Sequence, residues 1–261
     1  KIAIGIGGVG QIGINTTKIL LDAGASVVVI DLGSDYFNKT IAKLKEDYKS
    51  SNILPLNVDV TSEDELIQAK QEILDKFKSI DILVNLAHYK GDPRALKPHS
   101  KFFASLEDYP FDIWKETINT NLNGLFLSCK IFGKQMIEQT SGVIINISSI
   151  YGIVAPDMNI YEGSDFETEP DYPFIKGGVI MFSKYLASYY ANRGVRVNCI
   201  APGGFFNNQP EPFLTKYTDK VPLGRMACHD DMKGAALFLA SKASEYITGH
   251  VLPVDGGWTI T

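Results

Sequence analysis

The sequence predicts an α/β fold in which a parallel sheet is covered by helices on both faces. Short apolar, β-branched segments alternate along the whole chain with longer segments whose apolar residues recur at helical spacing. The segment SVVVID at residues 26–31 is apolar almost throughout, as expected of a strand that is buried on both faces. Strands that are separated by helices join through right-handed crossovers and therefore lie parallel.

Each element follows from this pattern. In the first half, strands are expected at residues 2–6, 26–31, 52–58 and 80–86, and helices at residues 12–23, 36–49 and 62–77. In the second half, strands are expected at residues 142–148, 195–200 and 251–254, and helices at residues 111–139, 172–192 and 230–240. Ser62 and Glu65 have the spacing of a capping box, which places the start of the third helix. Long irregular stretches, which favour a functional role in such a fold, are expected at residues 88–110, 151–171 and 202–225.

Composition and charge disfavour several classes of protein. The formal net charge of -5 disfavours a nucleic-acid-binding protein, which needs basic groups to neutralise phosphates. No apolar run approaches the ~20 residues that cross a bilayer, so we expect no membrane partner. The cysteines, Cys129, Cys199 and Cys228, are too far apart in the sequence for a metal knuckle or a redox pair, and we expect no metal. Their scarcity and the lack of a secretory apolar segment favour a reducing, cytoplasmic location.

A glycine cluster follows the first expected strand. Gly8, Gly10 and Gly13 fit the pattern G-x-G-x-x-G, while Gly7, Gly10 and Gly13 fit G-x-x-G-x-x-G, and the register stays open. In both registers the chain turns tightly, its backbone can approach a pyrophosphate, and a helix N-terminus faces that anion. A tight turn can require glycine without a ligand, but the position between a strand and a helix favours a dinucleotide site. We therefore expect a single dinucleotide-binding catalytic domain over residues 1–261, a doubly wound Rossmann fold with a seven-stranded parallel sheet flanked by helices on both faces.

The second expected strand ends in Asp31, eighteen residues after Gly13. A carboxylate at this place accepts hydrogen bonds from the adenosine ribose hydroxyls and repels a 2′-phosphate, so Asp31 favours NAD(H) over NADP(H). Asp59, which follows the third strand, has two interpretations, because it could accept from the adenine amino group or cap the next helix. The sequence does not decide between them.

Tyr172 and Lys176 lie four residues apart, which puts them on one face of a shared helix. A tyrosine has an unperturbed pKa of about 10, too high for a good base at neutral pH, and a fixed cation nearby favours the phenolate. Lys176 would supply that cation, and its ammonium donors could also hold a nicotinamide ribose. The spacing is common on helix surfaces by chance, so the pair gains weight only from its surroundings.

Together these features resemble the short-chain dehydrogenase/reductase family, in its single-domain branch, over the whole chain. The family's strand that ends in a serine pair matches Asn-Ile-Ser-Ser at residues 146–149, followed by Gly152. Its Asn-Leu-x-Gly segment matches residues 121–124, and its Pro-Gly segment beside the nicotinamide matches residues 201–203. The run at residues 247–257 resembles the usual last strand. The motifs agree in order and in spacing, which chance rarely produces.

The resemblance implies the roles of four catalytic residues. Ser149 would hydrogen-bond the substrate carbonyl, while Ser148 would be structural. Tyr172 would exchange the hydroxyl proton of the substrate, and Lys176 would lower the pKa of Tyr172 and hold the ribose. Asn121 would hold the water of a proton relay.

The resemblance also implies the cofactor NAD(H) and a small-molecule alcohol or carbonyl substrate. The residues expected to contact the cofactor are Gly7, Gly10, Gln11, Ile12, Gly13, Asp31, Asp59, Val60, Asn85, Ala87, Tyr172, Lys176, Pro202, Gly203 and Phe205.

Two departures from the family pattern affect the expected site. The family usually carries Asn-Asn-Ala-Gly after the fourth strand, where this chain has Asn-Leu-Ala-His at residues 85–88. Asn85 keeps a position near the adenosine half of the cofactor, and Leu86 loses an amide that usually ties the sheet together. His88 replaces a glycine beside the cofactor path; it could handle protons, but we favour shaping of the pocket or plain surface exposure. Ile6 stands where many members have threonine, which predicts different packing there.

The stretch between Ser149 and Tyr172 holds twenty-two residues, more than is usual in the family. It resembles the branch for flagellin modification and polysaccharide biosynthesis, which implies a sugar or sugar-nucleotide substrate. Residues 151–171 carry six acids and no lysine or arginine, and either border the pocket or form a solvated loop. Lys216, Lys220 and Arg225, in an aromatic stretch that could be a mobile lid, could meet a diphosphate.

Two other functions would use the same residues. A 3-oxoacyl or steroid-like reductase would share the catalytic set, but the first usually uses NADPH, which Asp31 disfavours. A cofactor-binding sensor that has lost catalysis would bind NAD(H) without turnover, and the complete catalytic set disfavours it.

The two longest expected helices, at residues 111–139 and 172–192, carry apolar residues on more than one face. Such a helix needs two partners, of which the sheet is one and another subunit is the natural second. Members of the family commonly pair these helices between subunits, which implies a homodimer or homotetramer.

Overall fold

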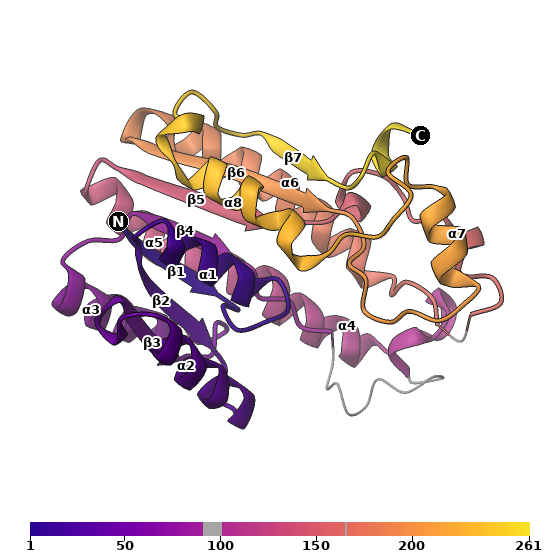
Figure 1. Cartoon of the computed structure of the whole chain (residues 1–261), viewed down its shortest axis with the longest axis horizontal. Helices are drawn as coiled ribbons and strands as arrows, with labels where there is room; N and C mark the ends of the chain where they lie inside the picture. The colour runs from indigo at the N-terminus through magenta and orange to yellow at the C-terminus, as the bar shows by residue number, and fades with distance from the viewer. Residues whose placement is uncertain (91–100, 165) are drawn as a thin grey trace.

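The computed structural model describes residues 1–90, 101–164 and 166–261, and is built around a seven-stranded parallel sheet (Figure 1). The strands are β1 (Ile2–Ile6), β2 (Ser26–Asp31), β3 (Ile53–Asn57), β4 (Ile82–Asn85), β5 (Gly142–Ile147), β6 (Val195–Pro202) and β7 (Val251–Val254). Their spatial order is β3-β2-β1-β4-β5-β6-β7, and each neighbouring pair is parallel. The order reverses between β1 and β4, so the predicted doubly wound sheet is confirmed.

Helices cover both faces of this sheet, with α1 and α8 on one side and α5 and α6 on the other (Figure 1). The helices are α1 (Gly13–Asp22), α2 (Asp35–Asp47), α3 (Glu63–Phe77), α4 (Phe111–Ile118), α5 (Gly124–Glu138), α6 (Asp171–Tyr190), α7 (Phe213–Asp219) and α8 (Lys233–Ala240). Alternate residues of β2 point to opposite faces of the sheet. Val28 packs against the helices of one face, α3, α5 and α6, and Val29 packs against those of the other face, α1, α2 and α8. Within the described part of the chain, no helix is both long and apolar enough to cross a bilayer.

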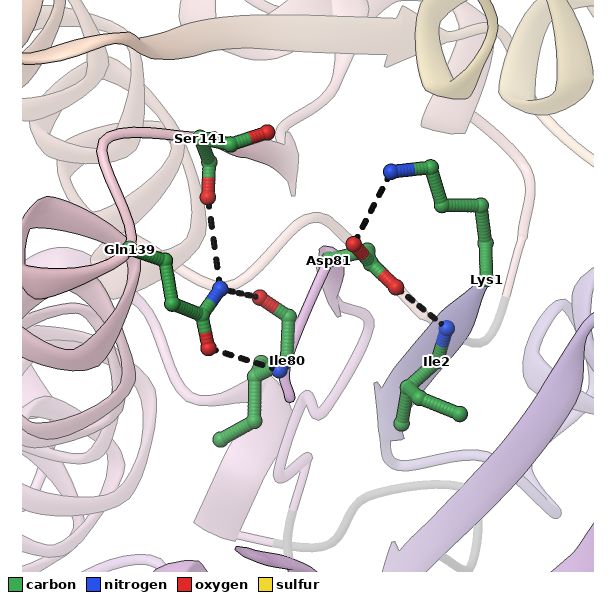
Figure 2. Close-up of polar contacts among 6 residues, drawn as sticks. All are labelled: Lys1, Ile2, Ile80, Asp81, Gln139 and Ser141. Carbon is green, nitrogen blue, oxygen red and sulfur yellow. Dashed lines mark hydrogen bonds and ion pairs between the residues drawn. The ribbon is translucent and has the colours of Figure 1, made fainter. Parts of the chain in front are cut away.

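Side chains fix the amino ends of β1 and β4 (Figure 2). Asp81, just before β4, accepts hydrogen bonds from the Ile2 backbone nitrogen at 2.7 Å and from the Lys1 ammonium at 2.9 Å. Gln139, just after α5, accepts from the Ile80 backbone nitrogen at 3.0 Å and donates to its oxygen at 2.7 Å. These bonds anchor the start of β4 beside β1. Because β1 and β4 are parallel, their carboxyl ends lie together at one edge of the sheet, which is where doubly wound folds bind ligands.

The predicted helix at residues 111–139 is present as one helical run, but it contains a π-helical turn that the sequence did not predict. The π-helical turn, Asn119–Asn123, lies between α4 and α5, and the residues at both of its ends have right-handed helical backbone angles. The apolar spacing stays compatible with a helix through this turn, which is why the pattern does not reveal it. π turns inside α-helices occur frequently at functional sites.

Two of the stretches expected to be irregular contain short helices. The stretch at residues 151–171 includes a 3₁₀ turn, Met158–Tyr161, and the stretch at residues 202–225 includes α7. Part of the first expected loop, residues 91–100, lies outside the described residues, as does residue 165.

Candidate active site

The turn between β1 and α1 is built from glycines that leave no room for side chains. A Cβ on Gly13 would overlap the Gly7 carbonyl oxygen, and one on Gly7 would lie 2.6 Å from the Ala87 backbone nitrogen. Gly7 also has a φ of 76°, which favours glycine. A Cβ on Gly8 would lie 2.9 Å from a Val29 methyl, so Gly8 lets the turn pack on β2. Gly7 and Gly13 therefore allow the tight turn to form, and Gly8 allows the turn to pack against β2.

The geometry of this turn fits a dinucleotide pyrophosphate. Gln11 and Ile12 lie between the glycines and the first residue of α1, and no described side chain caps that helix. The amide groups at the start of an uncapped helix can therefore bind an anion, and the missing Cβ atoms keep the approach of a phosphate open.

Asp31 lies against the glycine turn at the end of β2. Its carboxylate accepts hydrogen bonds from the backbone nitrogens of Val9 at 3.2 Å and Leu32 at 3.0 Å. Burial raises the pKa of Asp31, and these two hydrogen bonds oppose that rise. A carboxylate has about four lone-pair positions, so it can still accept from ribose hydroxyls.

Asp59 does not cap α3. The cap is Ser62, whose hydroxyl accepts from the Glu65 backbone nitrogen at 3.3 Å, and the predicted start of this helix is confirmed. One carboxylate oxygen of Asp59 instead accepts from the backbone nitrogen of Thr61 at 2.8 Å and from its hydroxyl at 2.7 Å. The capping interpretation of Asp59 was therefore wrong, and its role toward adenine stays a prediction.

Tyr172 and Lys176 lie on one face of α6, near its beginning. Pro173 fits there because the first turn of a helix needs no intrahelical amide donor. The Lys176 ammonium is 5.6 Å from the centroid of the Tyr172 ring and donates to the Ile147 backbone oxygen at 3.3 Å. Only 5% of Lys176 is exposed, and burial lowers the pKa of its ammonium to about 8. The structure thus places a cation beside the phenol.

The serine pair at the end of β5 lies against the same turn of α6. The Ser148 hydroxyl donates to the Lys176 backbone oxygen at 2.7 Å, as a structural role requires. Ser149 begins a 3₁₀ turn, and its hydroxyl accepts from the Tyr151 backbone nitrogen at 3.2 Å. A Cβ on Gly152 would lie 2.6 Å from both the Lys176 oxygen and the Ser148 hydroxyl. Glycine at this position lets the turn after Ser149 approach α6 closely.

Asn121 lies within the π turn and is buried. Its side-chain oxygen accepts from the Tyr89 backbone nitrogen at 2.7 Å, and its side-chain nitrogen donates to the Tyr89 oxygen at 2.9 Å. Asn121 therefore fixes the chain that leaves β4. Its part in a proton relay stays a prediction.

A hollow at the carboxyl edge of the sheet brings several predicted residues together. Residues of the predicted site that line it are Val60, Asn85, Ala87, Asn121 and Lys176. Gly203, at the end of β6, lines a second hollow with Tyr217 and Asp255. Pro202 is the last residue of β6, and Phe205 stacks on His229 with ring centroids 5.5 Å apart.

The described part of the stretch at residues 151–171 packs on α7 in a third apolar cluster, so a purely solvated loop is ruled out. Its buried members are Ile150, Tyr151, Ile160, Tyr161, Phe213, Tyr217, Val221, Met226 and Trp258. Tyr172 is partly buried against it. This cluster forms a wall beside the predicted catalytic tyrosine.

The three cations expected to meet a diphosphate are already paired with acids. The ion pairs are Lys220 with Asp157, Lys216 with Glu162 and Arg225 with Asp231. Lys216 also donates to the backbone oxygens of Asn159 and Glu162, each at 2.9 Å. These contacts join α7 to the acidic stretch. The structure therefore does not support the prediction that these cations await a diphosphate.

Comparisons with known proteins agree with this geometry. A family model described as enoyl-(acyl carrier protein) reductase, of the short-chain dehydrogenase type, matches residues 7–259. The chain belongs to the short-chain dehydrogenase/reductase family. It is an oxidoreductase, and enzymes of this family act on small-molecule substrates.

Two curated relatives cover nearly the whole chain. Post-translational flagellin modification protein A of Campylobacter coli is 30% identical over 99% of this chain and 98% of its own length. The 3-oxoacyl-(acyl-carrier-protein) reductase FabG of Chlamydia trachomatis is 35% identical over 98% of this chain and 96% of its own length.

Solved structures include neighbours with either nicotinamide cofactor. A short-chain dehydrogenase from Leptospira borgpetersenii with bound NAD+ has a TM-score of 0.85 at 35% identity, covering 99% of this chain and 92% of that one. A gluconate 5-dehydrogenase from Burkholderia cenocepacia in complex with NADP and tartrate has a TM-score of 0.86 at 28% identity, covering 100% and 96%.

Leu86, where this short-chain dehydrogenase/reductase departs from the family pattern, has no amide to tie the sheet together. The side chain of Asn85 makes such a connection instead. The Asn85 side-chain nitrogen donates to the Asn146 side-chain oxygen at 2.8 Å, and the Asn85 oxygen accepts from the Ser128 hydroxyl at 2.9 Å. Asn146 in turn donates to the Ser183 hydroxyl at 2.8 Å. Asn85 is thus buried in a network that joins β4, β5, α5 and α6.

The departure at His88 places an imidazole in the predicted site. His88 lines the same hollow as Lys176, and its ring meets the Tyr172 ring edge-on, with centroids 5.2 Å apart. Burial lowers the pKa of His88 well below its usual value, and the charges of Lys176 and Lys90 lower it further. Plain surface exposure was therefore the wrong expectation, whereas shaping of the pocket agrees with this position.

Sequence reasoning missed the tyrosines that surround Tyr172. The hydroxyls of Tyr151 and Tyr161 lie 3.1 Å apart, and the Tyr151 ring is 6.3 Å from that of Tyr172. Tyr217, on α7, accepts from the Gly204 backbone nitrogen at 2.5 Å. Burial raises the pKa of Tyr151 and of Tyr217, so their hydroxyls stay protonated. The cue in the sequence was the long stretch before Tyr172, but its spacing did not show which side chains point inward.

Proposed function

We propose that this short-chain dehydrogenase/reductase transfers a hydride between NAD(H) and a secondary alcohol or ketone of a sugar or sugar nucleotide. The observation that carries the proposal is the group of tyrosines beside Tyr172. The Tyr151 ring packs edge-on against the Tyr172 ring, and the Tyr151 hydroxyl is hydrogen-bonded to the Tyr161 hydroxyl. Protonated phenols both donate and accept, which suits a substrate with many hydroxyl groups. The similarity to a flagellin modification protein supports a role in glycan biosynthesis.

The proposed mechanism is general acid–base catalysis. In the oxidative direction Tyr172 removes the hydroxyl proton of the substrate, and the Ser149 hydroxyl donates to the same oxygen as it becomes a carbonyl. Lys176 favours the phenolate because its ammonium lies 5.6 Å from the ring in a buried setting. Asn121 holds a water that connects Lys176 to solvent. When bound, NAD(H) would accept or supply the hydride.

The preference for NAD(H) is proposed from Asp31. Its carboxylate is fixed against the glycine turn by the Val9 and Leu32 amides, so it cannot turn away without losing both hydrogen bonds. A 2′-phosphate beside it would meet a negative charge. Gly7 and Gly13 keep the backbone free for the pyrophosphate, and the whole of residues 1–261 would act as one catalytic domain.

A cofactor-absorbance assay tests the function. Purified protein is mixed with NADH or NADPH and one ketone from each class: a ketosugar, a nucleotide ketosugar, an acetoacetyl thioester and a steroid ketone. We expect turnover with NADH and a sugar-class ketone, and a loss of at least ~10²-fold in Tyr172→Phe with little change in NADH affinity. Near-normal turnover of Tyr172→Phe would remove Tyr172 from the mechanism.

A second candidate is a 3-oxoacyl reductase, which the 35% identity to FabG of Chlamydia trachomatis favours. The same assay distinguishes this function from the proposed one, because a 3-oxoacyl reductase would turn over the acetoacetyl thioester faster than the sugar-class ketones. Binding of NADH without turnover of any compound would favour a catalytically silent sensor instead.

We also propose a cytoplasmic homodimer or homotetramer that pairs its long helices between subunits. Apolar side chains remain exposed on α5 and α6, at Phe126, Phe174, Met181, Tyr185 and Tyr189. Exposed aromatic groups along a helix mark an interaction surface. Light scattering of the purified protein tests this, and a monomer would contradict it.

A further inference from the structure

His88 carries a buried nitrogen that the proposed catalytic mechanism does not use. Among the residues that the structure describes, Nδ1 of His88 has no hydrogen-bond partner although it is shielded from solvent. Buried polar atoms in folded proteins nearly always have a partner, so this nitrogen points to a group that arrives with a bound molecule.

The Lys176 ammonium has hydrogen-bond donors that are not used within the described part of the chain. It has three donors, and the Ile147 backbone oxygen at 3.3 Å is its one acceptor among the described residues. His88 and Lys176 line the same hollow. Both also flank one ring, since the His88 ring lies 5.2 Å and the Lys176 ammonium 5.6 Å from the Tyr172 ring centroid. The His88 ring and the Lys176 ammonium therefore both line this hollow and both lie beside the Tyr172 ring.

The place of His88 in the chain puts it next to the proposed cofactor path. It follows Ala87, whose backbone nitrogen would lie 2.6 Å from a Cβ on Gly7 in the glycine turn. The charged and titratable groups around it are Lys176 and Tyr172 on α6 and Lys90 on its own segment. Both lysines oppose protonation of the imidazole, so it remains a neutral ring that can accept a hydrogen bond.

We propose that His88 is a positioning residue that shares a ribose hydroxyl of the nicotinamide half of NAD(H) with Lys176. The Lys176 ammonium donates to the hydroxyl oxygen, and the hydroxyl proton is donated to Nδ1 of His88. This arrangement satisfies the buried acceptor, uses a second donor of Lys176 and fixes the ribose beside Tyr172. The inference rests on the proposed NAD(H) function.

Two variants test the role without an active substrate. His88→Leu keeps a side chain of similar size but has no acceptor, while His88→Asn can place an oxygen near the position of Nδ1. We expect His88→Leu to weaken NADH binding about tenfold, as measured by fluorescence titration, and His88→Asn to recover most of that loss. Thermal unfolding of each variant without cofactor shows whether a loss of binding reflects a loss of structure. Equal NADH affinity in His88→Leu and wild type would overturn the inference.

Nitrogen-15 NMR of histidine-labelled wild type gives a second readout, should His88→Leu fail to fold. The chain has four histidines, and the His88 signals are assigned by their absence in His88→Asn. We expect the Nδ1 resonance of His88 to stay that of an unprotonated nitrogen at neutral pH and to shift when NADH is added. An unchanged resonance in a sample that binds NADH would mean that Nδ1 meets water only, which overturns the inference. A wild type that binds no NADH would instead contradict the proposed function.

Discussion

The burial of Lys176 should cost stability at neutral pH, and replacing it with methionine should restore that stability. The side chain is 5% exposed, and the one hydrogen bond of its ammonium within the described residues is 3.3 Å long. Burial lowers the pKa of Lys176 because the ammonium loses hydration that a single backbone oxygen does not replace. Methionine keeps most of the length and apolar surface of the side chain and removes the charge.

The lowered pKa sets the size and the pH range of this effect. In the unfolded state the pKa of Lys176 is the ordinary 10.5, whereas in the folded state it is about 8. At about 1.36 kcal/mol for each pH unit, the difference subtracts about 3 kcal/mol from the free energy of unfolding at pH 7. Between pH 8 and pH 10.5 the unfolded state binds more protons than the folded state, so the penalty shrinks as the pH rises. It is absent above that range.

Urea unfolding followed by circular dichroism measures the effect in cofactor-free protein at one protein concentration. We expect Lys176→Met to be more stable than wild type by about 2–3 kcal/mol at pH 7, with a gain that declines toward pH 10. Lys184→Met is the matched control, because Lys184 is exposed on the same helix and should change stability by less than about 0.5 kcal/mol. If Lys176→Met is no more stable than wild type at pH 7, or if its gain does not depend on pH, the buried ammonium does not destabilise the folded state in this way.

Three further predictions concern the cofactor, the packing of the site and the assembly. Asp31→Ala should raise the affinity for NADPH relative to NADH at least about tenfold in fluorescence titrations, and an unchanged ratio would contradict the proposed preference. Gly152→Ala should lower the free energy of unfolding by about 1–3 kcal/mol, because its Cβ would lie 2.6 Å from the Lys176 oxygen. In Gly177→Ala the new Cβ would meet no described atom within 4 Å apart from its chain neighbours and the backbone of its own helix, so the same urea experiment should show no loss. Tyr185→Glu should shift the molecular mass in light scattering toward the monomer, and an unchanged mass would place the subunit contact elsewhere.

The strands and helices follow from the sequence because burial on one or both faces leaves a periodic trace. The ranges of β1, β2 and β7 agree with the prediction residue for residue. The π turn at Asn119–Asn123 leaves no such trace, because it changes the backbone hydrogen bonds while the apolar residues continue to face the core. The turn contains Asn121, whose side chain makes two hydrogen bonds to the Tyr89 backbone, and contacts this far apart in the sequence leave no local pattern.

The residues of the candidate site also fall into those that local spacing predicts and those whose contacts depend on the tertiary fold. Tyr172 and Lys176 meet on α6 because a spacing of four residues is a local property of a helix. The surroundings of His88 were not accessible from the sequence, since its neighbours come from α6 and from its own segment after β4. The same limit applies to Asn85, whose buried partners lie on β5 and α5.

The pairing of Lys216 and Lys220 with acids changes how the substrate pocket is understood. In the sequence these cations belong to a stretch interpreted as a lid, while the acids of residues 151–171 belong to a second stretch that either borders the pocket or forms a solvated loop. In the structure Lys216 pairs with Glu162 and Lys220 with Asp157, and the apolar cluster of both stretches packs against Tyr172. We therefore expect a change in either stretch to alter the position of the other. We expect substrate selection to depend on the two stretches as one unit, because both lysines are paired with acids and Tyr151 packs edge-on against Tyr172.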